Sequence, residues 1–218
     1  MDNSTTQSTT GNFKQSVRLA LLLTGLIWLI WIIGELLPLE LWQYGIYPGR
    51  YESLPGVLTA PLIHGSLSHL SSNSLPILVM LTILFYAYPR SSLIVLITLY
   101  IGSGLIVWVI ARPAWHYGAS GLTHGLMFFL FTVGVLRRDA MAAAFAMIVF
   151  FLYGGMVWGI FPRDPHISFE YHLAGAILGV VLAFVLRNYD RKPPIKHYDW
   201  EDEDEDEAIG DEWQKPDS

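Results

Sequence analysis

The sequence predicts an all-α membrane protein with six transmembrane helices and a structured loop after the first of them. Its 218 residues are 53% hydrophobic and only 15% charged, which is too apolar for a soluble domain of this length. Six apolar runs each approach the roughly 20 residues that a helix needs to cross a bilayer core about 30 Å thick. Charged residues stand at or between the ends of these runs.

In chain order, we predict the six spans at residues 17–37, 67–88, 92–111, 118–136, 140–161 and 169–186. The segment between the first two spans differs in kind. Its prolines and glycines forbid one continuous helix, and its aromatic side chains favour a membrane interface, as at Trp42, Tyr44 and Tyr47. We expect a structured loop that rests on the outer leaflet.

The two ends of the chain have another composition. Residues 1–12 are rich in Ser, Thr, Asn and Gln, and eleven of the 19 carboxylates lie in residues 199–218, beside a single lysine. Such segments bury too little apolar surface to fold. We therefore expect disorder at 1–16 and 188–218, on either side of a membrane domain at 17–187. The acidic tail is either a solvated appendage or a docking segment for a basic partner.

Composition also excludes several classes of function. The net charge of −6 belongs to the tail, and the rest of the chain has no clustered basic face, which excludes a nucleic-acid binder. The absence of cysteine excludes disulfides, thiolate metal sites and a cysteine nucleophile.

The distribution of Lys and Arg predicts the orientation. With the N-terminus inside, nine basic residues fall in cytoplasmic segments and three fall outside. Because cytoplasmic loops hold the excess of basic residues, we expect both termini in the cytoplasm, in a multi-pass protein of the cell membrane. A cleaved signal peptide is the alternative for the first run, but the run is long for one and no small-x-small site precedes residues 36–42.

Polar side chains inside the spans indicate where function lies, because they are costly in a membrane and usually face a cavity. In this orientation the second, fourth and sixth spans all begin at the outer side. Their first turns carry, in order, His64, His69, Asn73, Ser120, His124 and His172. The other three spans have nothing comparable, so we expect these side chains to meet at one depth in the outer leaflet.

These residue types can support nucleophilic catalysis. A histidine that takes the proton of a serine hydroxyl activates the serine, and two donors such as His69 and Asn73 can bind a developing oxyanion. Glycines allow the fourth and sixth spans to approach closely, as at Gly118, Gly121 and Gly175. The alternative is purely structural, with His and Asn bonding neighbouring helices and glycines serving packing alone.

No carboxylate is placed to complete a triad, since Glu170 faces away from His172 on a helix. The sequence therefore predicts a dyad. A metal site built by the four span histidines His64, His69, His124 and His172 is another possibility, although the chain has no carboxylate ligand beside them and no His-Glu-x-x-His motif.

Three motifs resemble those of the rhomboid family of intramembrane serine proteases: HGSLSHLSSN at 64–73, GASG at 118–121 and HLAGAILG at 172–179. Their order and their placement on the second, fourth and sixth spans are specific, and the resemblance covers about residues 17–187. It implies a rhomboid-like six-helix bundle. It further implies a serine endopeptidase that cuts single-pass membrane proteins near the outer leaflet of the lipid bilayer, without metal or cofactor.

The resemblance also implies a role for each residue. Ser120 would be the nucleophile and His172 the general base, while His69, Asn73 and the backbone N–H of Ser120 would form the oxyanion hole. The supporting residues would be His64, Gly118, Gly121, His124 and Gly175. A catalytically silent relative that binds membrane proteins is the alternative function.

Two positions depart from the family pattern. Residues 50–56 lack the Trp-Arg pair that many relatives carry in the first outer loop. His124 stands where the family commonly has a tyrosine that stacks beneath the catalytic histidine. We expect His124 to share the side of Ser120 and to affect the rate and the pH profile.

Overall fold

The computed structural model describes residues 9–37 and 39–192, and structural statements below concern these residues. Our expectations for 1–8 and 193–218 lie outside them. The helices are α1 (Phe13–Leu36), α2 (Gly56–Thr59), α3 (Leu67–Ala87), α4 (Ser92–Ile110), α5 (Ser120–Arg137), α6 (Ala140–Tyr153) and α7 (Phe169–Leu186), with short 3-10 segments η1 (Leu41–Tyr44), η2 (Tyr51–Ser53), η3 (Ala60–Leu62) and η4 (Gly154–Ile160).

In the described part of the chain, six helices are long and apolar enough to cross a membrane, which confirms the predicted number of spans. They are α1, α3, α4, α5, α6 continued by η4, and α7. The bounds of α7 match the prediction at both ends. Helix α1 begins four residues before the expected Val17, because the Asn12 side chain accepts a hydrogen bond from the Gln15 N–H and caps the helix.

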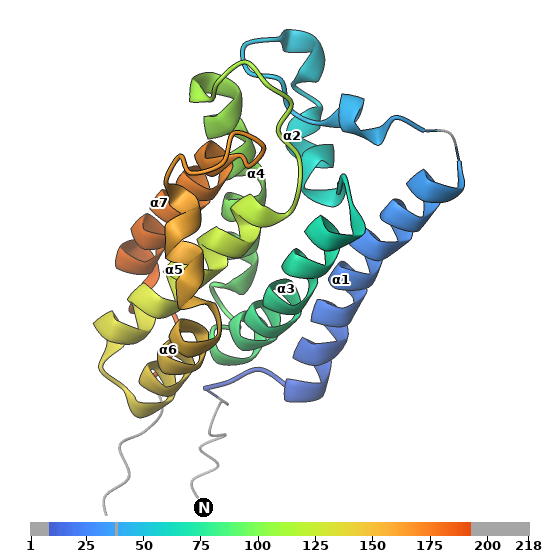
Figure 1. Ribbon diagram of the computed structural model, residues 1–218. Helices are drawn as coiled ribbons and strands as arrows, with labels where there is room; N and C mark the ends of the chain where they lie inside the picture. Colours follow the sequence, from blue (N-terminus) through green and yellow to red (C-terminus); the bar gives the residue numbers. More distant parts are fainter. Residues whose placement is uncertain (1–8, 38, 193–218) are drawn as a thin grey trace, which may run out of the picture.

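Helix α5 is the centre of the bundle. In its span 67% of the residues are buried, against 11% in α1 and 17% in α6 with η4, so α1 and α6 form the periphery. Figure 1 shows α5 between α7 and α3, with α1 at the edge beside α3. A residue on α5 can therefore meet side chains from several helices at once.

Both ends of the described chain lie at one end of the bundle, the terminal end, at the bottom of Figure 1. There Gly11 N–H donates to Tyr86 O at the end of α3 (2.7 Å), and Lys192 Nζ donates to Arg137 O at the end of α5 (2.7 Å). The opposite end, the loop end, holds the first turns of α3, α5 and α7. The polar residues of the sequence predicted that the beginnings of these three spans lie together.

The segment between α1 and α3 is structured, as expected, and covers the loop end. Ile46 exchanges two backbone hydrogen bonds with His116 of the α4–α5 loop (2.9 and 2.8 Å). Trp115 from that loop packs edge-on against Trp42 and Tyr47. These backbone bonds and ring contacts hold the loop in place, although it lacks the Trp-Arg pair of many relatives.

Candidate active site

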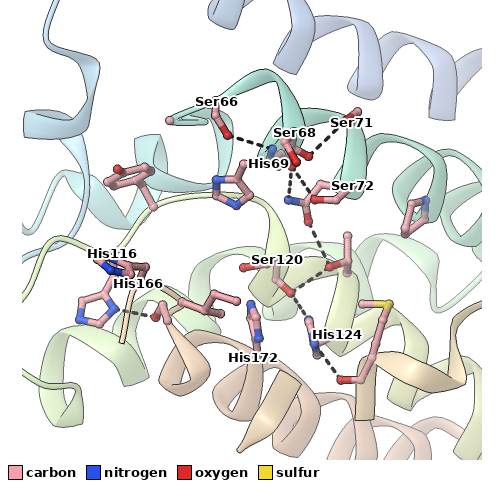
Figure 2. Close-up of a pocket in the computed structure, with 18 of the residues that line it drawn as sticks. Ser66, Ser68, His69, Ser71, Ser72, His116, Ser120, His124, His166 and His172 are labelled. Atoms are coloured by element: carbon pink, nitrogen blue, oxygen red, sulfur yellow. Dashed lines mark hydrogen bonds between the residues drawn. The ribbon is translucent and has the colours of Figure 1, made fainter. Parts of the chain in front are cut away.

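A cavity of about 940 Å³ opens at the loop end of the bundle. Helix α3 contributes His69 and Asn73 to its wall, α5 contributes Ser120 and His124, and α7 contributes His172. Figure 2 shows the side chains of His69, Ser120, His124 and His172 gathered around one space. The structure therefore brings together five of the six polar residues that the sequence singled out, and places the sixth, His64, behind them.

Ser120 is the first residue of α5 and is 9% exposed. The turn before it depends on Gly118, which has a φ of +115°, a conformation that favours glycine. A Cβ on Gly118 would also lie 2.6 Å from the His69 ring. The first turn of α5 has backbone N–H groups without helical partners, so the serine stands where an oxyanion could be bound.

His172 lies in the first turn of α7 and is 8% exposed. Its Nδ1 is 2.9 Å from Gly159 O. Because a carbonyl oxygen only accepts, Nδ1 carries the hydrogen and Nε2 keeps the lone pair that a general base needs. The ring lies beside Ser120 and points toward it (Figure 2), but the described structure has no hydrogen bond between the Ser120 hydroxyl and His172.

The candidate oxyanion donors lie on one face of α3. The His69 ring is half-buried against Gly118. Asn73 is 5% exposed; its Nδ2 donates to His69 O (3.0 Å), and its Oδ1 accepts from the Thr123 hydroxyl (3.4 Å). An amide nitrogen has two hydrogens, so one Asn73 N–H remains for a ligand in the cavity.

His64 contacts the turn before Ser120 from outside the cavity. Its Nε2 accepts a hydrogen bond from Ala119 N–H (3.4 Å), and its ring centroid lies 4.9 Å from that of His69. Burial, with the nearby His69, lowers the pKa of His64 to about 4. The ring is therefore neutral near pH 7, as an acceptor for Ala119 must be.

His124 stacks flat on His172, with ring centroids 3.9 Å apart and planes within 9°. The histidine thus occupies the place of the stacking tyrosine expected from the family pattern. Its Nδ1 lies 2.7 Å from Ser120 O and its Nε2 lies 3.1 Å from Met156 O. It touches the catalytic candidates on both α5 and α7.

The close approach of α5 and α7 depends on their glycines. A Cβ on Gly175 would overlap the backbone oxygen of Gly121, and a Cβ on Gly121 would overlap the Tyr171 ring. Without these side chains the two backbones nearly touch, which places Ser120 and His172 beside the same cavity.

The sequence did not reveal two further contacts at the site. Segment η4, at the end of the fifth span, presents the carbonyl oxygens of Met156 and Gly159 to the two stacked histidines. Only the cluster of glycines at 154, 155 and 159 could have hinted at this. His116 is also fully buried, with Nδ1 2.6 Å from Ser168 Oγ and Nε2 3.0 Å from Arg112 O.

Glu170 contacts Arg112 of the α4–α5 loop. Its Oε1 lies 3.6 Å from the Arg112 guanidinium and accepts from Arg112 N–H (3.4 Å). The carboxylate is thus engaged with the α4–α5 loop. Within residues 9–37 and 39–192, no group of three or more His, Asp or Glu side chains is placed to hold a metal ion, so the geometry does not favour the four-histidine metal site.

Comparisons with known proteins agree with the motifs. The family model described as Rhomboid domain matches residues 51–189. Uncharacterized proteins of Mycobacterium tuberculosis and Mycobacterium bovis are each 33% identical over 176 residues, which is 77% of this chain and 73% of theirs. An uncharacterized protein of Mycobacterium leprae is 32% identical over 77% of this chain and 70% of its own.

Proposed function

The chain belongs to the rhomboid family and is a multi-pass membrane protein, and from this premise we propose that it is an intramembrane serine endopeptidase. The observation that carries the proposal is the fixed tautomer of His172, whose lone-pair nitrogen is free beside Ser120 in a polar cavity. The substrates are single-pass membrane proteins whose transmembrane segments enter from the lipid bilayer. Both termini are cytoplasmic in the cell membrane, so cleavage takes place near the outer leaflet.

In the proposed reaction, Ser120 Oγ attacks the carbonyl carbon of the scissile peptide bond and passes its proton to His172 Nε2. The oxyanion receives hydrogen bonds from the Ser120 N–H, the free Asn73 N–H and His69. His172 then gives the proton to the leaving amine, which yields an acyl-enzyme. A water molecule, deprotonated by the same ring, hydrolyses the ester. No step needs a metal or cofactor.

Fluorophosphonate labelling of purified protein in lipid tests this proposal. We expect the wild type to be labelled and to cleave a model transmembrane substrate, while Ser120→Ala and His172→Ala are folded but do neither, because each lacks one member of the dyad. The cleavage rate of each variant should lie at least about 10³-fold below that of the wild type, as for other serine dyads and triads. Labelling that persists in Ser120→Ala would refute the assignment.

Ser168→Ala is the matched control. Ser168 also touches a histidine in the cavity wall, His116, but its Oγ accepts from Tyr171 N–H (3.3 Å) and caps α7. We therefore expect Ser168→Ala to be labelled. Loss of labelling in this variant and not in Ser120→Ala would identify Ser168 as the nucleophile.

A catalytically silent member of the family that binds membrane proteins is the second candidate. Two observations favour it: the described structure has no Ser120–His172 hydrogen bond, and His124 replaces an aromatic neighbour of the catalytic histidine. Wild-type protein that is folded in several lipids, yet neither labelled nor able to cleave, would support this candidate over the protease.

A further inference from the structure

Segment η4 presents two backbone oxygens to the ring nitrogens of two histidines of other helices. It continues α6 as a 3-10 helix, Gly154–Ile160. Its Gly159 O lies 2.9 Å from His172 Nδ1, and its Met156 O lies 3.1 Å from His124 Nε2. Both contacts run from backbone oxygen to ring nitrogen, so they depend on where η4 lies rather than on its side chains.

The Gly159 carbonyl occupies the position of the third member of a triad. In a Ser-His-Asp triad the carboxylate accepts from the ring nitrogen remote from the serine, and thereby fixes the tautomer and orientation of the ring. Glu170 is engaged with Arg112. The acceptor that His172 does have is Gly159 O, which fixes the tautomer without adding a negative charge.

His124 links this acceptor segment to the nucleophile helix. Its ring lies between Ser120 O, at 2.7 Å, and Met156 O on η4, and it stacks on His172. A neutral ring carries one N–H, so it donates to one of these oxygens and packs against the other. The ring is 5% exposed, so it fills the space between α5 and η4. A displacement of His124 would move η4, and with it the oxygen that orients His172.

Residue 159 must be small for these contacts to form. A Cβ at this position would lie 2.8 Å from His124 Nε2 and 3.0 Å from His172 Nδ1, so it would press against both stacked rings. Gly155, in the same segment, is exposed, and a Cβ there would meet no atom within 4 Å. The two glycines therefore form a matched pair for mutation.

We propose that Gly159 and His124 are positioning residues, with the Gly159 carbonyl orienting His172 in place of a triad carboxylate and the His124 ring tethering η4 to α5. This inference rests on the proposed protease function. It assigns to His124 a hydrogen bond to a backbone oxygen that a phenylalanine ring, which has no ring nitrogens, could not make.

The experiment compares wild type, Gly159→Ala, Gly155→Ala and His124→Phe in lipid. The measurements are kcat and KM for a transmembrane substrate, the rate of fluorophosphonate labelling and the thermal midpoint. Histidine labelled with ¹⁵N adds a direct readout, because NMR shifts distinguish protonated from unprotonated ring nitrogens. The signal of His172 is assigned by its absence in His172→Ala.

In Gly159→Ala we expect kcat and the labelling rate to fall by at least about tenfold with KM nearly unchanged, since small displacements of catalytic groups are costly. His172 should then lose its single Nδ1–H tautomer. Gly155→Ala should match the wild type in all readouts. His124→Phe keeps a stacked ring without ring nitrogens, so kcat falls and the tautomer is mixed while the thermal midpoint stays near that of wild type.

Other results would overturn the inference. A wild type without labelling or cleavage refutes the proposed function itself. An active wild type with Gly159→Ala equal to Gly155→Ala refutes the role of Gly159. Unchanged kcat and tautomer in His124→Phe refute the tether.

Discussion

At the scale of single residues, the partners of three buried histidines determine which ring nitrogen carries the hydrogen. His172 donates through Nδ1 to Gly159 O, whereas His64 accepts through Nε2 from Ala119 N–H. His116 faces Arg112 O with Nε2 and can accept the Ser168 hydroxyl hydrogen with Nδ1. Each arrangement suits a neutral ring. A proton added to His64 Nε2 would point at the Ala119 N–H group and remove its acceptor.

This requirement predicts a loss of stability in acid. The pKa of His64 falls from 6.5 to about 4 on burial, so the unfolded chain binds the proton first. The stability that neutral His64 contributes is complete above pH 6.5 and is lost as the pH falls toward 4, by up to about 3 kcal/mol. We expect the thermal midpoint in lipid to decline over this window, and to decline less in His64→Gln, whose amide oxygen can still accept from Ala119.

Two other histidines define the controls for this titration. Burial also lowers the pKa of His116, so a smaller decline of the same sign remains in His64→Gln. His166 is exposed and lies on the rim of the cavity, so His166→Gln should follow the wild type. Equal declines in wild type and His64→Gln would contradict the role given to His64.

At the scale of elements, the contact of α5 with α7 sets the relative position of Ser120 and His172. Gly121 and Gly125 on α5 face Gly175 and Gly179 on α7, and a Cβ on either α7 glycine would overlap a backbone oxygen of α5. Backbone cannot give way as a flexible side chain can. Two pairs of glycines therefore set how closely Ser120 and His172 approach each other.

Gly175→Ala should separate these helices. The added methyl group meets the Gly121 oxygen, so α7 must shift, at a cost of about 1 to 3 kcal/mol. We expect a lower thermal midpoint and a loss of fluorophosphonate labelling of at least about tenfold, because His172 moves with α7. Gly25→Ala, on α1 where a Cβ meets nothing within 4 Å, is the control. Normal labelling of Gly175→Ala would show that the dyad tolerates a wider spacing.

The sequence predicted these elements well because their signals are carried by side chains. Apolar length defined the six spans, and the depth of Ser120 and His172 predicted their meeting at one cavity. The carbonyl oxygens on η4 that face the two histidines could not be predicted, because every residue has a carbonyl oxygen. Which of these oxygens faces a histidine depends on the 3-10 geometry of Gly154–Ile160. The contact of His116 with Ser168 escaped because it joins two loops whose course a helix pattern does not define.

At the scale of the whole molecule, α7 is fastened at both ends. At the loop end Ser168 and Glu170 bond to His116 and Arg112. At the terminal end the buried Asp190 accepts from the Arg90 N–H (2.7 Å) and from Ser91, ahead of α4. Arg137, 1% exposed, donates to the backbone oxygens of Asp190 and Arg191. Hydrogen bonds and an ion pair thus hold α7, the helix that carries His172, at both of its ends.

Because the loop end and the terminal end lie at opposite ends of the bundle, the orientation of the molecule in the membrane can be tested. The chain has no cysteine, so an introduced cysteine is its only thiol. Glu52 is exposed at the loop end and Asn188 is exposed at the terminal end. If nine of the twelve basic residues before the tail face the cytoplasm, a membrane-impermeant maleimide should label Glu52→Cys in intact cells and Asn188→Cys only after permeabilisation. Both variants should be labelled after permeabilisation, which controls for access. The reverse pattern would place Ser120 near the inner leaflet, and the substrates would then be cut at their cytoplasmic ends.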